Sequence, residues 1–236
     1  MSQDLYLEDS YLKECDAVIN SVKNDKFIVL NRTIFYPKGG GQPHDIGKIL
    51  RENDSYNVEY VGKFEGTTSH EVDRAGLKEG DRVHCILDWE RRHKLMRNHT
   101  AAHTLAALLE KETGALITGN QLEEEKVRFD FSLEDFDREL FQKLIDKANA
   151  LFKKDIPVKW YDLPKKEAMQ ITGVVKLANV LPPNIPVLRI VEIQGLDKQA
   201  DGGTHVKNLN EIGAMEMIKA ENKGKNNRRV YFRLIN

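Results

Sequence analysis

Two histidines stand four residues apart in a segment whose apolar residues follow helical spacing. They are His99 and His103 of HTAAH, within RRHKLMRNHTAAHTLAALLEKETG. At 3.6 residues per turn, positions four apart lie on one side of a helix, about 40° apart around its axis. Such a pair can bind one zinc ion, although histidines that pack in a core and form hydrogen bonds there have the same spacing. The intervening Thr-Ala-Ala lacks the glutamate base of the HExxH motif of helical zinc hydrolases.

A second group of potential ligands follows much later in the chain. Asp201 and His205 stand four apart in DGGTH, with two glycines between them. The glycines allow a tight turn that brings both side chains to the same side, although DGGTH alone is also an ordinary β-turn. Two ligands from a helix and two from a tight loop complete a tetrahedral set for zinc. The two segments therefore predict one metal site, provided that they meet in the fold.

The elements before residue 90 are predicted to be short strands. KFIVLNRTIFY is rich in β-branched and aromatic residues, and GKILRENDSYNVEYVG indicates a hairpin that turns at Asn53-Asp54. In DRVHCILDW, the side chains of Val83, Cys85 and Leu87 are predicted to face one way, and those of Arg82, His84, Ile86 and Asp88 the other. Several short strands joined by glycine-rich turns predict a small β-barrel.

After Trp89 the apolar residues change to helical spacing, which ends at Gly114. KVRFDF predicts a strand, and Ser132 with Asp135 resembles a capping box that opens a second helix. The inward residues of that helix are predicted to be Phe136, Leu140, Leu144, Ala148 and Leu151. IPVKWYDL and PVLRIVEI predict strands, and AMEMIKA with RRVYFRLI predicts a hairpin around ENKGKNN.

The predicted fold class is α+β in two domains. Residues 1–90 form an N-terminal β-barrel with a glycine-rich loop, and residues 91–236 form an α+β domain with helices packed on an antiparallel sheet. A chain of 236 residues with 31% charged residues is typical of a soluble globular protein. Two cysteines imply no disulfide framework, and no segment indicates a signal peptide or a membrane span, so a cytoplasmic protein is expected.

The net charge of −1 excludes a generally basic nucleic-acid binder but leaves room for local basic patches. A cluster of basic residues is most often a charged surface exposed to solvent. If both clusters border one binding site, they instead form a surface to which an RNA backbone can bind. The first cluster consists of Arg91, Arg92, Lys94 and Arg97. The second consists of Lys219, Lys223, Lys225, Arg228, Arg229 and Arg233.

HTAAH followed by GGTHV resembles the HxxxH and CxxxH pair of alanyl-tRNA synthetase editing domains and of their free-standing relatives, the AlaX proteins. Further segments are similar to landmarks of that family in the same order: TIFYPKGGGQPHDIGKI, LDWERRHKLMRNHTAAH, TGNQ, VRFDF, DLPKKEA and THVKNLNEIG. The resemblance covers most of the chain, includes the barrel, and implies the medium-length type without the C-terminal domain of the longest members.

The resemblance implies one zinc ion per chain and a set of site residues. The expected metal ligands are His99, His103, Asp201 and His205. Thr118, Gln121 and Asp201 are expected to act in catalysis. The glycine loop is expected to cover the editing pocket, and the expected substrate contacts are Thr33, Gly39, Gly40, Gly41, Gln42, Arg91 and Arg92.

One position departs from the family pattern, because Asp201 stands where the family carries a cysteine. Asp201 can ligate zinc through oxygen, which gives a harder site of three histidines and one aspartate. Alternatively, it orients a histidine or a water that completes the metal's ligands. Loss of the metal is a third alternative.

The implied reaction is hydrolysis of a wrongly attached amino acid from alanine tRNA, with serine as the main substrate and glycine as a weaker one. A pocket with a polar partner for the serine hydroxyl spares alanine, because alanine leaves that partner unpaired. No Ser-His-Asp arrangement or reactive cysteine near the site indicates covalent catalysis. The alternatives are a zinc hydrolase of small esters, a non-catalytic module that binds charged tRNA, and editing of a threonyl-type tRNA.

Overall fold

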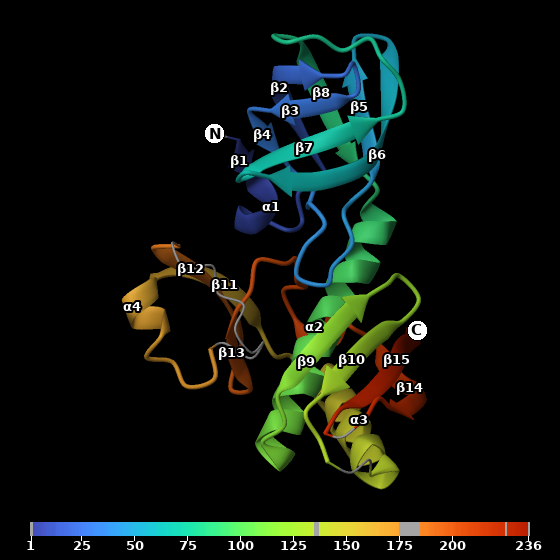
Figure 1. Ribbon diagram of the computed structural model, residues 1–236, viewed down its shortest axis with the longest axis vertical. Coiled ribbons are helices and arrows are strands. Elements are labelled where there is room, and N and C mark those ends of the chain that lie inside the picture. The colour runs from blue at the N-terminus through green and yellow to red at the C-terminus, as the bar shows by residue number, and fades with distance from the viewer. Residues whose placement is uncertain (1, 135–136, 175–184, 225, 236) are drawn as a thin grey trace. The chain divides into compact units, whose positions relative to one another are not determined.

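The computed structural model describes residues 2–134, 137–174, 185–224 and 226–235, which form two compact units, Met1–Leu95 and Met96–Asn236 (Figure 1). The first is a closed barrel of antiparallel strands, and the second combines helices with antiparallel sheets. This architecture confirms the predicted α+β class. Among the described residues, none of the helices has both the length and the apolar character that a membrane crossing requires.

The barrel closes because its last strand pairs with two earlier ones, β2 on one side and β5 on the other. The strand order is β2-β3-β7-β6-β5-β8. The bounds are β2 (Glu14–Lys23), β3 (Phe27–Leu30), β5 (Gly47–Arg51), β6 (Asp54–Phe64), β7 (Thr67–Val72) and β8 (Arg82–Leu87). Outside the barrel order, β1 (Gln3–Asp4) pairs in parallel with β4 (Arg32–Thr33), and α1 (Leu5–Glu8) is a single turn.

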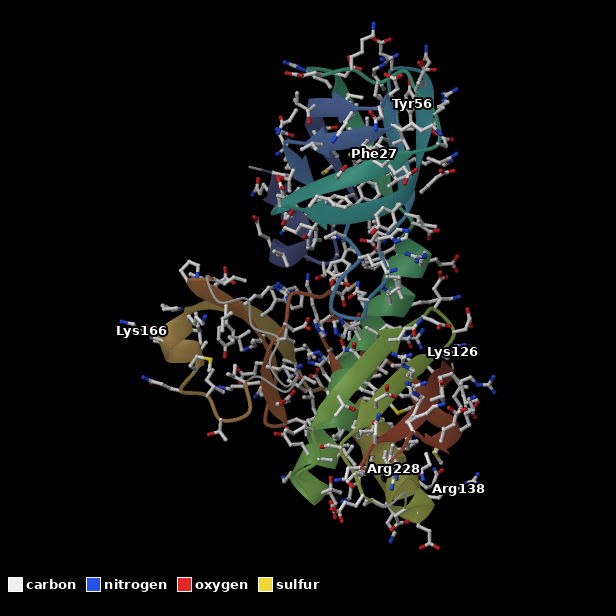
Figure 2. All side chains as sticks on the ribbon, viewed as in Figure 1. Phe27, Tyr56, Lys126, Arg138, Lys166 and Arg228 are labelled. Atoms are coloured by element: carbon white, nitrogen blue, oxygen red, sulfur yellow. The ribbon has the colours of Figure 1, made fainter. Side chains whose placement is uncertain are left out.

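Alternation of side chains fills the barrel interior. Val83, Cys85 and Leu87 of β8 are buried as the sequence pattern predicted, because successive residues of a strand point to opposite faces. The predicted hairpin is confirmed as β5–β6, but it turns at Glu52-Asn53 and not at Asn53-Asp54, because Asp54 already pairs with Arg51; Glu52 has a positive φ of 54°. The sequence analysis did not identify β2, whose apolar residues are interrupted by polar ones. Phe27 and Tyr56, on β3 and β6, are labelled on this unit in Figure 2.

The long helix α2 (Trp89–Thr113) begins in the first unit and continues into the second. It ends, as predicted, at Gly114, whose φ of 72° is the left-handed conformation that commonly terminates a helix. A four-stranded sheet follows, in the order β14-β15-β10-β9. Its strands are β9 (Ile117–Leu122), β10 (Val127–Phe131), β14 (Ala214–Asn222) and β15 (Arg228–Ile235), the last two forming the predicted closing hairpin.

The second unit contains two antiparallel sheets rather than the single one expected. Strands β11 (Val158–Pro164), β12 (Val187–Ile193) and β13 (Asp197–Ala200) pair only with one another among the described strands. Two short helical turns accompany them, α4 (Lys165–Ala168) and the 3-10 turn η1 (Leu209–Glu211). The loop after β13 carries the DGGTH segment, so this small sheet holds one half of the predicted metal site.

Helix α3 (Arg138–Phe152) packs against β14 but begins later than predicted. The predicted capping box at Ser132 was wrong; the N-cap is Asp137, whose carboxylate accepts hydrogen bonds from the next turn's backbone amides. Asp135 and Phe136 lie outside the described residues. Of the other predicted inward residues, Leu144 and Ala148 are buried, whereas Leu140 and Leu151 are half-buried. The rest of the buried stripe consists of Phe141, Ile145 and Phe152.

A buried histidine links the barrel strands β3 and β7 to the short strand β4. The Phe35 amide donates to the Thr33 hydroxyl, which lies 2.7 Å from Nε2 of His70, and Nδ1 of His70 lies 3.0 Å from the Ile28 carbonyl. Since a carbonyl can only accept, Nδ1 carries the proton, and the Thr33 hydroxyl donates to Nε2. Burial lowers the pKa of His70 to about 4. The neutral ring is therefore part of the folded barrel.

Protonation of His70 should destabilise the protein in mild acid. The unfolded ring titrates near 6.5, so the stabilisation is complete above that pH and is lost as pH falls toward the folded value of about 4. Between the unfolded value and the folded value of the His70 pKa, the free energy of unfolding falls by about 3 kcal/mol. We expect the free energy of unfolding of His70→Gln, measured in urea at pH 7 and pH 5, to fall less than that of the wild type.

The matched control for this measurement is His84→Gln, because His84 is exposed and forms ion pairs with Asp16 and Glu14. Because those ion pairs raise the pKa of His84, its protonated ring stabilises the fold at pH 5, so that variant should lose at least as much stability between the two pH values as the wild type. An identical pH dependence in His70→Gln and wild type would contradict the assignment of a buried neutral ring.

Candidate metal centre

The helix α2 and the loop after β13 bring together four side chains that are far apart in the sequence. His99 and His103 come from the helix, and Asp201 and His205 come from the loop. One ligand atom from each lies within 4.8 Å of the other three. All three imidazoles are buried, with ring centroids 4.3–4.9 Å apart. The structure therefore brings together the four predicted ligands in a group that could hold a metal ion.

The glycine turn can approach the helix only because Gly203 has no side chain. A Cβ added at Gly203 would lie 2.2 Å from Cε1 and 2.5 Å from Nδ1 of His99, closer than real Cβ contacts allow. A Cβ added at Gly202 would meet nothing within 4 Å. The close packing against His99 therefore requires a glycine at position 203 but not at position 202.

The backbone of the turn is fixed by an arginine that the sequence analysis did not select. Arg189 on β12 donates from Nη1 to the carbonyls of Asp201 and Gly203, each at 3.0 Å, and its backbone carbonyl accepts from the Asp201 amide. Its guanidinium lies 5.4 Å from the centre of the Trp160 ring. These contacts orient the carboxylate of Asp201 toward the histidines. In PVLRIVEI, Arg189 alternates with apolar residues, as an exposed residue of a strand also does. The sequence pattern therefore did not reveal its role at the turn.

A threonine on the same helix sets the proton position on His205. The Thr100 hydroxyl donates to the Met96 carbonyl and accepts from the Val206 amide, so toward Nδ1 of His205, 3.1 Å away, it acts as an acceptor. Nδ1 therefore carries the ring proton and Nε2 presents a lone pair. Nε2 lies 3.1 Å from Oδ1 of Asp201, which also accepts from the Gly203 amide. Two lone pairs facing each other at this distance favour a cation beside them.

Electrostatics favour neutral imidazoles at His99 and His205 and an ionised carboxylate at Asp201. Burial lowers the pKa of His99 to about 4 and holds the pKa of His205 well below its usual value. Burial alone would raise the pKa of Asp201, but its interactions with the facing histidines when they are protonated outweigh burial and hold that pKa well below its usual value, so a proton taken up by the group goes to an imidazole and not to the carboxylate. Neutral imidazole and ionised carboxylate are the forms that bind metal.

The spacing of the donor atoms also suits an ion. Nε2 of His99 and Nε2 of His103 lie 3.6 Å and 3.8 Å from Oδ2 of Asp201, too far for good hydrogen bonds. Ligands at 2.0–2.1 Å around a tetrahedral zinc ion lie about 3.3 Å from one another. Nδ1 of His103 is buried and has no hydrogen-bond partner among the described residues. The donor set and its spacing therefore fit a metal ion of the zinc type.

The two polar residues expected to act beside the metal lie on β9. Thr118 and Gln121 are exposed, and their side chains form hydrogen bonds with Asn227 and Glu123, respectively, each at 3.2 Å. These contacts run along the four-stranded sheet. The catalytic role of both residues stays a prediction.

The glycine-rich loop forms a tight turn in the first unit. Gly39 and Gln42 exchange backbone hydrogen bonds, while Gly40 and Gly41 have positive φ values of 57° and 87° that other residues rarely adopt. Gly39 and Gly40 are exposed, Gly41 is half-buried and Gln42 is buried. Thr33 is also buried, with its hydroxyl in the His70 chain of hydrogen bonds. The predicted substrate contacts of these residues stay predictions.

The two arginines at the start of α2 have different surroundings. Arg91 is half-buried and donates to the His44 carbonyl. Arg92 is completely buried, with Nε 3.0 Å from both carboxylate oxygens of Asp45, and it donates to the carbonyls of Ser10 and Ile34. A buried, paired guanidinium cannot reach a phosphate, so this placement corrects the predicted substrate contact of Arg92 to a structural role in the first unit.

Most cations of the C-terminal basic cluster are paired with carboxylates. Arg229 pairs with Asp130, Arg233 with Glu216, and Lys219 and Lys223 with Glu221. Arg228, labelled in Figure 2, is buried and donates to Asn222 and to neighbouring carbonyls. Lys225 lies outside the described residues. This pairing reduces the positive charge that the cluster offers to an RNA backbone.

Curated relatives match the whole chain. An alanyl-tRNA editing protein AlaX-M from Methanosarcina barkeri is 49% identical over 242 residues, which cover 100% of both chains. The chain belongs to the AlaX-M family of alanyl-tRNA editing proteins. A second AlaX-M protein, from Saccharolobus solfataricus, is 44% identical over 98% of both chains. These matches confirm the resemblance that the motifs indicated.

The AlaX-M chain is also similar to part of a synthetase. An alanine–tRNA ligase from Pyrococcus furiosus is 35% identical over 225 residues, which cover 93% of the chain but 24% of the ligase. Two family models match separate segments. The model described as tRNA synthetases class II (A) matches residues 9–91, and the model for the threonyl and alanyl tRNA synthetase second additional domain matches residues 188–231. The second match includes Arg189, Asp201 and His205.

Substitution of the two neighbouring glycines of this AlaX-M chain should have unequal effects. We expect Gly203→Ala to displace the His99 ring and to weaken metal binding by about 10- to 100-fold, the range found when groups that orient metal ligands are changed. Gly202→Ala should bind metal like the wild type, because its methyl group meets open space. Zinc titration against a competing chelator measures both, with circular dichroism to verify folding. Equal affinities in the two variants would contradict the packing argument.

Proposed function

We propose that this chain is a trans-editing aminoacyl-tRNA hydrolase that removes mischarged serine, and more weakly glycine, from alanine tRNA. The observation that carries the proposal is the convergence of two segments on a buried centre with four metal-ligand atoms, in a chain of the alanyl-tRNA editing family. The bond to be cleaved is the ester between the amino acid and the terminal ribose. The partner is mischarged alanine tRNA, and the reaction takes place in the cytoplasm.

We further propose that the centre holds one Zn²⁺ through His99, His103, Asp201 and His205. When bound, zinc supplies a Lewis acid that polarises the ester carbonyl or lowers the pKa of a water. The protein keeps the His99 and His205 imidazoles neutral by burial and presents Nε2 of His205 through the hydrogen bond to Thr100. Arg189 and the Gly203 amide hold the carboxylate of Asp201 in place.

For Asp201 we favour direct ligation through Oδ2. Its other oxygen, Oδ1, already accepts from the Gly203 amide and faces His205, whereas Oδ2 is the oxygen closest to the ring nitrogens of His99 and His103. A carboxylate oxygen in place of a thiolate makes the donor set harder and removes the group that oxidants attack most readily. The centre would then function with three imidazoles and one carboxylate.

The proposed selectivity depends on a polar partner for the serine hydroxyl. Thr118 and Gln121 are the candidates for that contact, and the glycine loop from Gly39 to Gln42 and Arg91 are candidate contacts for the charged tRNA. A hydroxyl that binds such a partner discriminates strongly, because alanine leaves the partner unpaired. Correctly charged tRNA would thereby be protected.

The direct test is deacylation of alanine tRNA charged with serine, glycine or alanine. We expect the rate constants to fall in the order serine, glycine, alanine, with serine released at least about 10-fold faster than alanine, as one discriminating polar contact allows. Release of alanine as fast as serine would contradict the selectivity. Binding of charged tRNA without turnover would indicate a non-catalytic module, and turnover of small esters without RNA would indicate a general esterase.

The metal assignment is tested at Asp201. We expect Asp201→Ala to lose bound zinc and at least about 100-fold in deacylation rate, because a metal ligand and its charge are removed together. Asp201→Cys should keep one zinc per chain, since thiolate is a normal zinc ligand. Metal quantification of both purified variants and kinetics on Ser-tRNA give the readouts. Full activity and zinc content in Asp201→Ala would show that Asp201 is no ligand.

A further inference from the structure

The chain's two cysteines, distant in sequence, are cross-strand neighbours in the barrel. Cys15 on β2 lies directly opposite Cys85 on β8 in the antiparallel register. Opposite residues in such a pair have Cα atoms about 4.5–5.5 Å apart, within the 4.4–6.8 Å that disulfides span. Both thiols are free. The register therefore supplies a geometry in which a single bond could join the two strands.

Both cysteines face the interior of the barrel. Their strand neighbours Ala17 and Val83 are a buried pair in the same register, and Cys15 packs against the same core as Cys85. The residues on either side of Cys15 point outward instead, where Asp16 and Glu14 form ion pairs with His84. The two sulfur atoms thus lie on one face of the sheet and share one environment.

The two thiols differ in accessibility. Cys15 is half-buried, whereas Cys85 is completely buried. A hydrogen bond with Cys85, which outweighs partial burial, lowers the pKa of Cys15, and the nearby Arg32 guanidinium acts in the same direction. The pKa of Cys85 is raised by its hydrogen bond with Cys15 and by burial. Since the thiolate is the nucleophile, Cys15 is the thiol suited to react first and Cys85 the one suited to follow.

We propose that Cys15 and Cys85 form an oxidative modification site at which a peroxide oxidant joins them in a reversible cross-strand disulfide. The site is separate from the metal centre, which contains no cysteine. Because the sequence has only two cysteines, these are its only thiols open to this chemistry. The bond would link β2 to β8, the pair of strands at which the barrel closes.

The reaction takes place in two steps. The Cys15 thiolate attacks one peroxide oxygen, the O–O bond breaks, and the departing hydroxide takes up a proton to form water, which leaves a sulfenic acid on Cys15. The Cys85 sulfur then attacks the Cys15 sulfur, the S–O bond breaks, and the hydroxyl leaves as a second water with the Cys85 proton. Hydrogen peroxide is reduced by two electrons, and the two thiols are oxidised to one disulfide.

The test treats the reduced full-length chain with hydrogen peroxide, blocks free thiols and digests the protein with trypsin without reduction. Cleavage after Lys13 and Arg82 releases peptides 14–23 and 83–91, each of which holds one cysteine. We expect mass spectrometry to find these two peptides linked, with the link abolished by dithiothreitol. We also expect the oxidised barrel to melt about 5 °C or more above the reduced one, because the bond closes a long loop.

Two variants serve as controls. In Cys85→Ala, a substitution that keeps a small apolar side chain, Cys15 should stop at the sulfenic acid and be captured by dimedone. In Cys15→Ser, peroxide should leave the melting temperature unchanged. The proposal is overturned if both wild-type thiols stay titratable after peroxide, or if the only disulfide is one between two chains on a non-reducing gel. The wild-type peptide measurement decides the question even if a variant fails to fold.

Discussion

The site depends on one close approach, that of the glycine turn to the face of α2 that carries His99 and His103. The missing side chain of Gly203 allows it, because any Cβ there would overlap the His99 ring. Once the turn is in place, a single carboxylate lies among three buried imidazoles, and burial suppresses the positive charge of two of them, His99 and His205. A negative charge among neutral donors is an arrangement that a divalent cation completes.

Much of the surrounding structure holds that approach in place. Arg189 joins β12 to the turn through two carbonyls, and Thr100 joins the helix to the loop through Val206 and His205. Neither residue is a candidate metal ligand; each forms hydrogen bonds to the segment that carries the ligands. Such supporting contacts fix the orientation and tautomer of a metal ligand. The turn itself supplies a hard carboxylate donor at Asp201.

The first unit relies on buried polar groups that are fully paired. Arg92 has Asp45 and two carbonyls as partners, and His70 has Thr33 and the Ile28 carbonyl. Loss of one partner of such a group is costly because the other is left without water or a hydrogen bond. Residues whose sequence context suggests surface charge or a polar pocket therefore form hydrogen bonds in the interior of the first unit.

The sequence by itself determined the α+β class, the barrel hairpin, the long helix with its glycine stop, the closing hairpin and the four candidate ligands, because helical and strand periodicities and short motifs are local properties. It could not determine that Arg92 is buried, that Arg189 supports the turn, that α3 is capped by Asp137, or that Cys15 faces Cys85. Those facts depend on strand register and on contacts between distant segments, which only the tertiary structure decides. Charge and residue type are fixed along the chain, whereas partners are fixed by packing in three dimensions.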